Sequence, residues 1–88
     1  MSNNKVFIVD VREEAEYQKQ HIKGSKNIPL SLLKSDVNIL DKLDKDLQVI
    51  IYCNSGNRAE IGCQIFCENG FSNTRNGINI NNMKKLNF

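Results

Sequence analysis

The sequence predicts an α/β fold in which a small, mainly parallel sheet carries helices on both faces. Two continuous apolar runs, residues 6–9 (VFIV) and 49–52 (VIIY), are typical of strands that are covered on both sides. Segments with helical spacing lie between these runs and after the second one. Strands that alternate with helices along a chain usually pair in parallel, because each helix carries the chain back across the sheet.

The first half of the chain continues from the strand at residues 6–9 into a helix. Three glutamates at residues 13–16 complement a helix dipole, and Gly24 lies beyond the expected helix end. Residues 26–28 are expected to form a short extended piece that Pro29 stops. Ser31 can then cap a brief helix, and the apolar residues at 37, 40 and 43 keep a roughly helical spacing.

The second half is organised around the apolar run at residues 49–52. A helix is expected from residue 57 to residue 68, closed by the Asn-Gly pair that follows it. Residues 74–75 are expected to form a last short strand. Residues 79–87 form a weak terminal helix at best, because asparagine disfavours helices.

Composition limits the class of protein and its partners. The 88 residues predict a single domain over residues 1–88, with a core of about residues 6–77. The net charge of +2 comes from interleaved basic and acidic residues, so no nucleic-acid partner is expected. No run approaches the roughly 18 apolar residues of a membrane span, so no membrane partner is expected either.

The cysteines and the first residues bear on the compartment. Three cysteines are an odd number, and reduced thiols in a cytoplasmic protein are the simpler interpretation. Residues 1–5 lack the apolar region of a secretory signal. Export to the periplasm stays open as the alternative if a signal peptide has been removed. The expected oligomeric state is a monomer or a weak homodimer.

Cys53 is the leading candidate for chemistry because of what surrounds it. It ends the strand at residues 49–52, a short polar loop follows, and a helix begins near Asn57. The N–H groups of such a loop and first helical turn lack intrahelical partners and attract an anion, here a thiolate. The alternative is that Cys53 is only a small apolar residue at the end of a strand.

Three segments of the chain resemble one protein family, and they occur in the family's order. Residues 53–58 (CNSGNR) resemble the Cys-x-x-Gly-x-Arg active-site loop of rhodanese-type sulfurtransferases. Residues 9–17 (VDVREEAEY) resemble the family's "DVRE..EY" segment, and residues 21–30 (HIKGSKNIPL) its "HIPGAINIPL" segment. The chain departs from the family pattern at the late "GGI..W" segment, which appears as residues 76–78 (NGI), and it has no Trp. This departure, together with residues 52–54 (YCN), resembles the short phage shock protein E type in particular.

The resemblance implies a thiosulfate sulfurtransferase that uses no cofactor and no metal. The Cys53 thiolate would take the outer sulfur of thiosulfate or a related donor and pass it to a thiophilic acceptor such as cyanide or a thiol. A protein could also act as the acceptor. The substrate-binding residues that it implies are those of the loop: Asn54, Ser55, Gly56, Asn57 and Arg58. Their amides would hold the charge of the terminal sulfur, and Arg58 would help to bind an anionic donor.

The remaining polar candidates are expected to have structural roles, or, for Arg58, a structural alternative to donor binding. Asp10 and Arg12 match a family pair that ties loops together near the active site. His21 is the only histidine, and it is expected to hydrogen-bond within its turn rather than to act as a base. Arg58 could pair with an acid purely for structure.

Cys63 and Cys67 lie further along the helix, about 9 Å and 15 Å from Asn57. They are too far for a disulfide with Cys53 and are expected to be incidental, with Cys67 the more reactive toward alkylating agents. Two helical cysteines and a distant histidine also make a poor zinc site.

Two other functions remain open. Phosphatases and arsenate reductases also use a Cys…Arg anion cradle, but their loops place five residues between Cys and Arg, where this chain has four. The shorter loop favours one sulfur atom over a tetrahedral oxyanion. A persulfide relay or binding module that serves a protein partner would use the same Cys53, and it is the main alternative.

Overall fold

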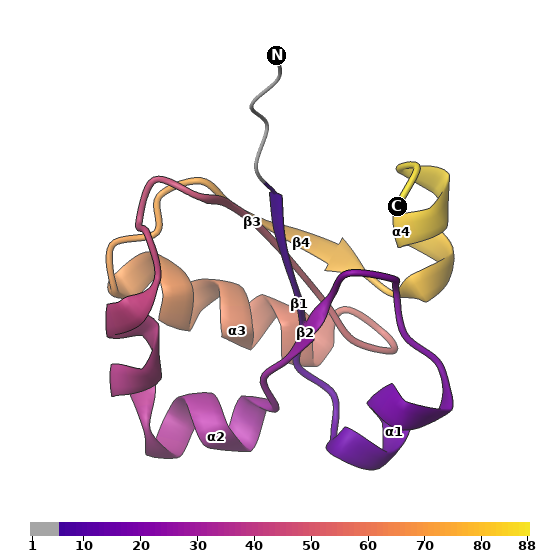
Figure 1. Cartoon of the computed structure of the whole chain (residues 1–88), viewed down its shortest axis with the longest axis horizontal. Coiled ribbons are helices and arrows are strands. Elements are labelled where there is room, and N and C mark those ends of the chain that lie inside the picture. Colours follow the sequence, from indigo (N-terminus) through magenta and orange to yellow (C-terminus); the bar gives the residue numbers. More distant parts are fainter. Residues whose placement is uncertain (1–5) are drawn as a thin grey trace.

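A four-stranded sheet forms the centre of the molecule (Figure 1). This computed structural model describes residues 6–88, so residues 1–5, where no secretory signal was expected, lie outside it. The strands are β1 (Val6–Asp10), β2 (Lys26–Asn27), β3 (Gln48–Tyr52) and β4 (Thr74–Ile78). They lie in the order β2-β1-β3-β4, and each of the three pairings is parallel. The predicted parallel sheet is therefore confirmed.

The helices follow the expected order, with small differences in their bounds. They are α1 (Glu14–Lys19), α2 (Leu30–Ser35), the 3-10 helix η1 (Val37–Lys42), α3 (Asn57–Glu68) and α4 (Ile80–Lys85). Helix α2 begins just before Ser31, because Pro29 takes the N-cap position. Strand β4 is longer than the predicted two residues, since pairing with β3 extends it to Ile78. Among residues 6–88, no helix has the length and apolar character that crossing a bilayer requires.

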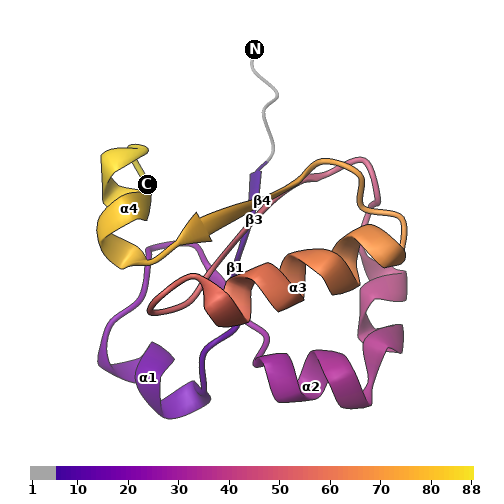
Figure 2. The same ribbon diagram turned by 180° about the vertical axis from the view of Figure 1, so that it is seen from behind.

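Side chains of the two central strands alternate between two apolar layers. Val9, Val49 and Ile51 pack with α2, η1 and α3 on one face, where Phe66 of α3 is fully buried. This face is toward the viewer in Figure 2, with α3 in front of the strands. On the other face, residues of β1 and β3 pack against the segment after α1 and against α4. The members of that second layer are Ile8, Ile22, Ile50, Tyr52 and Met83.

The parallel arrangement brings the carboxyl ends of the strands to one edge of the sheet. Asp10 is in register with Tyr52, and Tyr52 is in register with Ile78. The chain leaves β1 for the edge strand β2 on one side and leaves β3 for β4 on the other. In open α/β sheets, ligands bind in the crevice where connections diverge in this way. The first residue after β3, at this position, is Cys53.

Candidate active site

The sulfur of Cys53 accepts hydrogen bonds from two backbone amides. The Gly56 N–H lies 3.1 Å from Sγ and the Ala59 N–H lies 3.3 Å from it. The Cys53 N–H is itself held, since it donates to the Ile78 carbonyl oxygen of β4 at 3.0 Å. Cys53 is only 1% exposed, but its sulfur has polar partners rather than apolar contacts alone.

The start of α3 explains why these amides meet at the sulfur. Gly56 is the N-cap residue, and an N-cap side chain normally accepts a hydrogen bond from the third helical residue, here Ala59. Gly56 has no side chain, and the Cys53 sulfur takes that acceptor's place. Gly56 also has a φ of 95°, in the left-handed region that favours glycine. The loop sequence therefore places a sulfur where a helix cap would be.

Other predicted loop residues have hydrogen-bond partners away from the Cys53 sulfur. The Asn57 N–H faces the Ser55 Oγ at 3.4 Å, and the side chains of Asn54 and Arg58 reach Glu16 on α1. Ala59 was missed because it lies one residue beyond the loop motif. Its position as the third helical residue after a glycine N-cap was the signal that could have found it.

Glu16 connects α1 to the loop through one carboxylate. Its Oε1 and Oε2 accept from Arg58 Nη1 at 2.8 Å and Nη2 at 3.2 Å, and Oε2 also accepts from Asn54 Nδ2 at 2.7 Å. The Arg58 hydrogen bonds, followed by the Glu13 backbone N–H, lower the pKa of Glu16 to about 2. Glu16 reciprocally raises the pKa of Arg58. Arg58 thus makes the acid pairing that was one of its two predicted roles, and donor binding by Arg58 stays a prediction.

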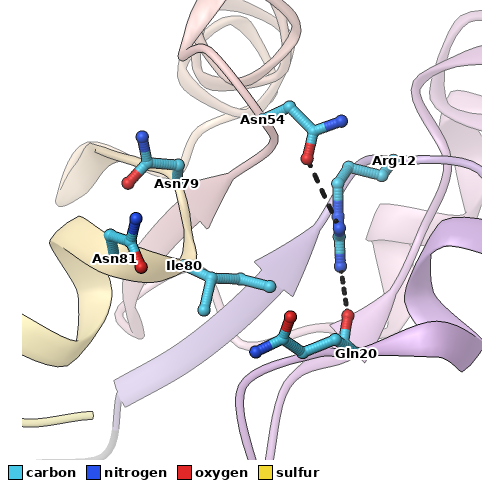
Figure 3. Close-up of a pocket in the computed structure, with 6 residues that line it drawn as sticks. All are labelled: Arg12, Gln20, Asn54, Asn79, Ile80 and Asn81. Carbon is cyan, nitrogen blue, oxygen red and sulfur yellow. Dashed lines mark hydrogen bonds between the residues drawn. The ribbon is translucent and has the colours of Figure 1, made fainter.

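Asp10 and Arg12 form a buried ion pair at the end of β1. The Arg12 Nη2 lies 2.7 Å from Asp10 Oδ2, with the side chains 7% and 0% exposed. Hydrogen bonding to Asp10 raises the pKa of Arg12. The same guanidinium donates to the Gln20 carbonyl oxygen at 2.6 Å and, over a longer 3.4 Å, to Asn54 Oδ1 (Figure 3). Arg12 therefore links the end of β1 to the segment after α1 and to the loop.

A polar cavity of about 250 Å³ borders the loop (Figure 3). It lies between the Arg12 guanidinium and the start of α4, and Asn54 forms part of its wall. Its lining residues are Arg12, Gln20, Asn54, Asn79, Ile80 and Asn81. The cavity therefore adjoins the candidate active site at the carboxyl ends of the strands.

The end of β4 also supports the loop, which the sequence did not indicate. The Asn76 side chain donates to the Gly56 carbonyl oxygen at 3.0 Å and accepts from the Ile78 N–H at 2.8 Å. Ile78 has a φ of 72°, and the Asn79 N–H donates to the Gly77 carbonyl oxygen at 2.9 Å, as in a strained γ-turn. This strained turn carries the carbonyl that holds the Cys53 N–H.

The remaining candidates lie outside the sulfur's contacts. His21 is exposed, stacks on the Tyr17 ring with centroids 3.7 Å apart, and has Nδ1 2.7 Å from the Tyr17 carbonyl oxygen. Burial raises the pKa of the Cys63 thiol to about 12, whereas Cys67 is exposed. Within residues 6–88, no group of three or more His, Cys, Asp or Glu side chains could hold a metal ion.

Comparisons with known proteins point to one family. A family model described as a rhodanese-like domain matches residues 1–79. The chain is 34% identical over 68 residues to the thiosulfate sulfurtransferase PspE of Escherichia coli (strain K12), covering 77% of this chain and 64% of PspE. It is 36% identical over 75 residues to YrkF of Bacillus subtilis (strain 168), which is named for a sulfur-carrier role, covering 85% of this chain and 39% of YrkF. The chain thus spans less than two thirds of either relative.

A solved structure agrees with these matches. A rhodanese with anions from E. coli superposes with a TM-score of 0.76 at 30% sequence identity, covering 88% of this chain and 89% of that one. The resemblance of the three sequence segments and the predicted fold are both confirmed by these matches. The chain belongs to the rhodanese-like domain family.

Proposed function

We propose that this protein is a sulfurtransferase that moves a sulfane sulfur from thiosulfate or a related donor to a thiophilic acceptor through a persulfide on Cys53. The observation that carries the proposal is the pair of amides, from Gly56 and Ala59, that donate to the Cys53 sulfur. Membership of the rhodanese-like family and the similarity to PspE support the same chemistry.

The surroundings of Sγ suit a negatively charged sulfur. The Gly56 and Ala59 amides donate to it, and both belong to the positive, N-terminal end of the 12-residue helix α3. The Cys53 thiolate attacks the outer sulfur of thiosulfate. A sulfur–sulfur bond forms to Cys53, the sulfur–sulfur bond of the donor breaks, and sulfite leaves with the electron pair. Charge is conserved, because a thiolate and a dianion give a persulfide anion and sulfite.

The second half of the reaction restores the thiolate. An acceptor such as cyanide or a thiol attacks the outer sulfur of the persulfide, and the Cys53 sulfur leaves with the bonding electrons. This is covalent catalysis with ping-pong kinetics. In this proposal Cys53 is the catalytic residue, the loop binds substrate, and Asp10, Arg12 and His21 have structural roles near the site. The loop residues concerned are Asn54, Ser55, Gly56, Asn57 and Arg58.

Mass spectrometry of the intact protein after thiosulfate treatment tests the proposal. Wild-type protein should gain the mass of one sulfur atom and lose it to cyanide, with thiocyanate released. Cys53→Ser should show no gain. Cys67→Ser is the matched control, because it removes an exposed thiol and should load as wild type does. A gain that persists in Cys53→Ser would contradict the persulfide assignment.

A relay module is the second candidate, favoured by the similarity to YrkF, whose name refers to a sulfur carrier. In this role Cys53 would receive its sulfur from one protein and hand it to another. Saturable turnover with thiosulfate and cyanide supports the enzyme. Loading of Cys53 from a persulfidated protein, with no loading from small donors, supports the relay.

A further inference from the structure

Arg58, the loop residue that could bind an anionic donor, is already paired with Glu16. Both oxygens of the Glu16 carboxylate accept from the Arg58 guanidinium, at 2.8 Å and 3.2 Å. The same carboxylate accepts from Asn54 at 2.7 Å. The side chains of two predicted substrate-binding residues, Asn54 and Arg58, are therefore occupied by a residue of α1.

The Glu16 carboxylate has the chemistry of an oxyanion ligand. Arginine binds carboxylates and other oxyanions through the same pair of parallel N–H groups. The sulfonate end of thiosulfate offers such oxygens, so it has to displace Glu16 from Arg58 or approach while the carboxylate stays in place. If the carboxylate stays in place, thiosulfate meets an Arg58 guanidinium whose charge is already paired, together with the nearby negative charge of Glu16. A persulfide of a small uncharged thiol has no oxyanion and avoids this competition.

We infer that Glu16 determines donor specificity, by competing with oxyanion donors such as thiosulfate and favouring persulfides of small uncharged thiols. This inference rests on the proposed sulfurtransferase function and names the donor class for the same site. The transfer from such a donor balances. The Cys53 thiolate attacks the outer sulfur of RS–SH, a sulfur–sulfur bond forms to Cys53, and the RS–S bond breaks. RS⁻ leaves with the electron pair, and Cys53 carries S–SH.

Two features make Glu16 suited to this competition. Its carboxylate is charged at neutral pH, and it stays charged well into the acid range because Arg58 lowers its pKa to about 2. The Glu13 N–H fixes Oε1 at 2.9 Å, which holds the side chain over the first turn of α1. At the same time the pair is open to water, with Arg58 35% and Glu16 31% exposed, so a ligand can exchange with it at low cost.

The opposite role, in which Glu16 positions Arg58 to receive thiosulfate, gives the opposite result on substitution. If Glu16 competes, its neutralisation improves the use of thiosulfate. If Glu16 positions Arg58, the same change impairs it. Glu16→Gln separates the two, because the amide keeps the shape of the side chain and loses its charge.

The experiment measures the second-order rate constant for sulfur gain on Cys53 from thiosulfate and from the persulfide of 2-mercaptoethanol. In Glu16→Gln the ratio of the thiosulfate constant to the persulfide constant should rise about tenfold, because thiosulfate binds more tightly. The persulfide constant should change by less than about twofold. Glu14→Gln is the matched control on the same helix, since Glu14 is exposed and accepts a hydrogen bond from Gln18 of its own helix at 3.4 Å. It should leave both constants unchanged.

A double variant tests whether the gain depends on Arg58. In Glu16→Gln/Arg58→Gln the thiosulfate gain should disappear, because the released guanidinium is what attracts the dianion. Glu16→Ala should shift the ratio in the same direction as Glu16→Gln. It replaces Glu16→Gln as the test variant if circular dichroism shows that Glu16→Gln is not folded. An unchanged or lowered ratio overturns the inference alone. Failure of wild-type Cys53 to load from either donor overturns the proposed function instead.

Discussion

Two arginine–carboxylate pairs flank the candidate active site, and they differ chiefly in burial. Arg12 and Asp10 are two residues apart in sequence, lie 2.7 Å from each other, and are 7% and 0% exposed. Arg58 and Glu16 are 42 residues apart, lie 2.8 Å from each other, and are 35% and 31% exposed. The bond lengths are nearly equal, so distance alone does not distinguish the pairs.

Burial decides what each pair can do. A buried charge that loses its partner remains out of water, so Arg12 and Asp10 hold each other and fix the end of β1. A charge that is about a third exposed becomes solvated when it loses its partner, so on the proposed chemistry Arg58 can exchange Glu16 for another anion. On the proposed chemistry, the same kind of pair therefore serves as scaffold in one place and as an exchangeable contact in the other.

The largest expected effect breaks the buried pair. Arg12→Met leaves the Asp10 carboxylate buried without its cation and should lower the free energy of unfolding by about 3 kcal/mol. For a domain of this size, that corresponds to a Tm lower by roughly 15 °C. Arg58→Met, the matched change in the exposed pair, should cost less than about 1 kcal/mol. Urea unfolding of both variants measures the difference, and equal losses would remove the distinction between the pairs.

A smaller effect is expected from the loop backbone, which holds the Gly56 amide at the Cys53 sulfur beside Arg58. Gly56→Ala forces a side chain into a φ of 95° and should cost about 1–2 kcal/mol. It should also slow the gain of sulfur by Cys53, because the Gly56 N–H shifts. Gly24→Ala is the control, with a φ of 86° and no atom within 4 Å of the added Cβ. It should lose similar stability and keep the wild-type loading rate, and equal loading by both variants would contradict this role of Gly56.

The smallest effect is the pH dependence of the exposed pair. The fold lowers the pKa of Glu16 from its ordinary 4.5 to about 2, so it favours the charged carboxylate. The resulting stabilisation is fully present above pH 4.5 and is lost as the pH falls through about 2. Because both side chains are about a third exposed, it should amount to no more than about 1 kcal/mol. The difference in unfolding free energy between wild type and Glu16→Gln, measured at pH 7 and near pH 2, should shrink toward zero at the lower pH; a constant difference would exclude the ion pair as its source.

The fold was predictable from the sequence where the pattern is local. The apolar runs at β1 and β3 are long and uninterrupted, so both strands could be identified. Strand β4 was underestimated because Asn76 and Gly77 are poor strand formers, and only pairing with β3 makes them extended. The single-domain organisation stays a prediction.

The candidate site, like the fold, could be predicted from the sequence only where its contacts are local. Cys53 and Gly56 belong to one contiguous motif, and the motif predicted a sulfur surrounded by amides. Glu16 appeared in the sequence as a charge that complements the dipole of α1 and as part of the segment that resembles "DVRE..EY", and neither pattern gave it a contact with the loop. Its contact with Arg58 spans 42 residues and depends on how α1 packs beside the loop. Roles that depend on such long-range contacts could not be inferred from spacing alone.

The near-complete burial of Cys53 has a consequence for its resistance to damage. With 1% of its surface exposed, the resting residue is shielded from bulky oxidants and from disulfide exchange with other proteins. Once loaded, the transferred atom lies one bond, about 2 Å, beyond Sγ. On the proposed chemistry, the outer sulfur of the persulfide would be more accessible to other molecules than the Cys53 sulfur itself.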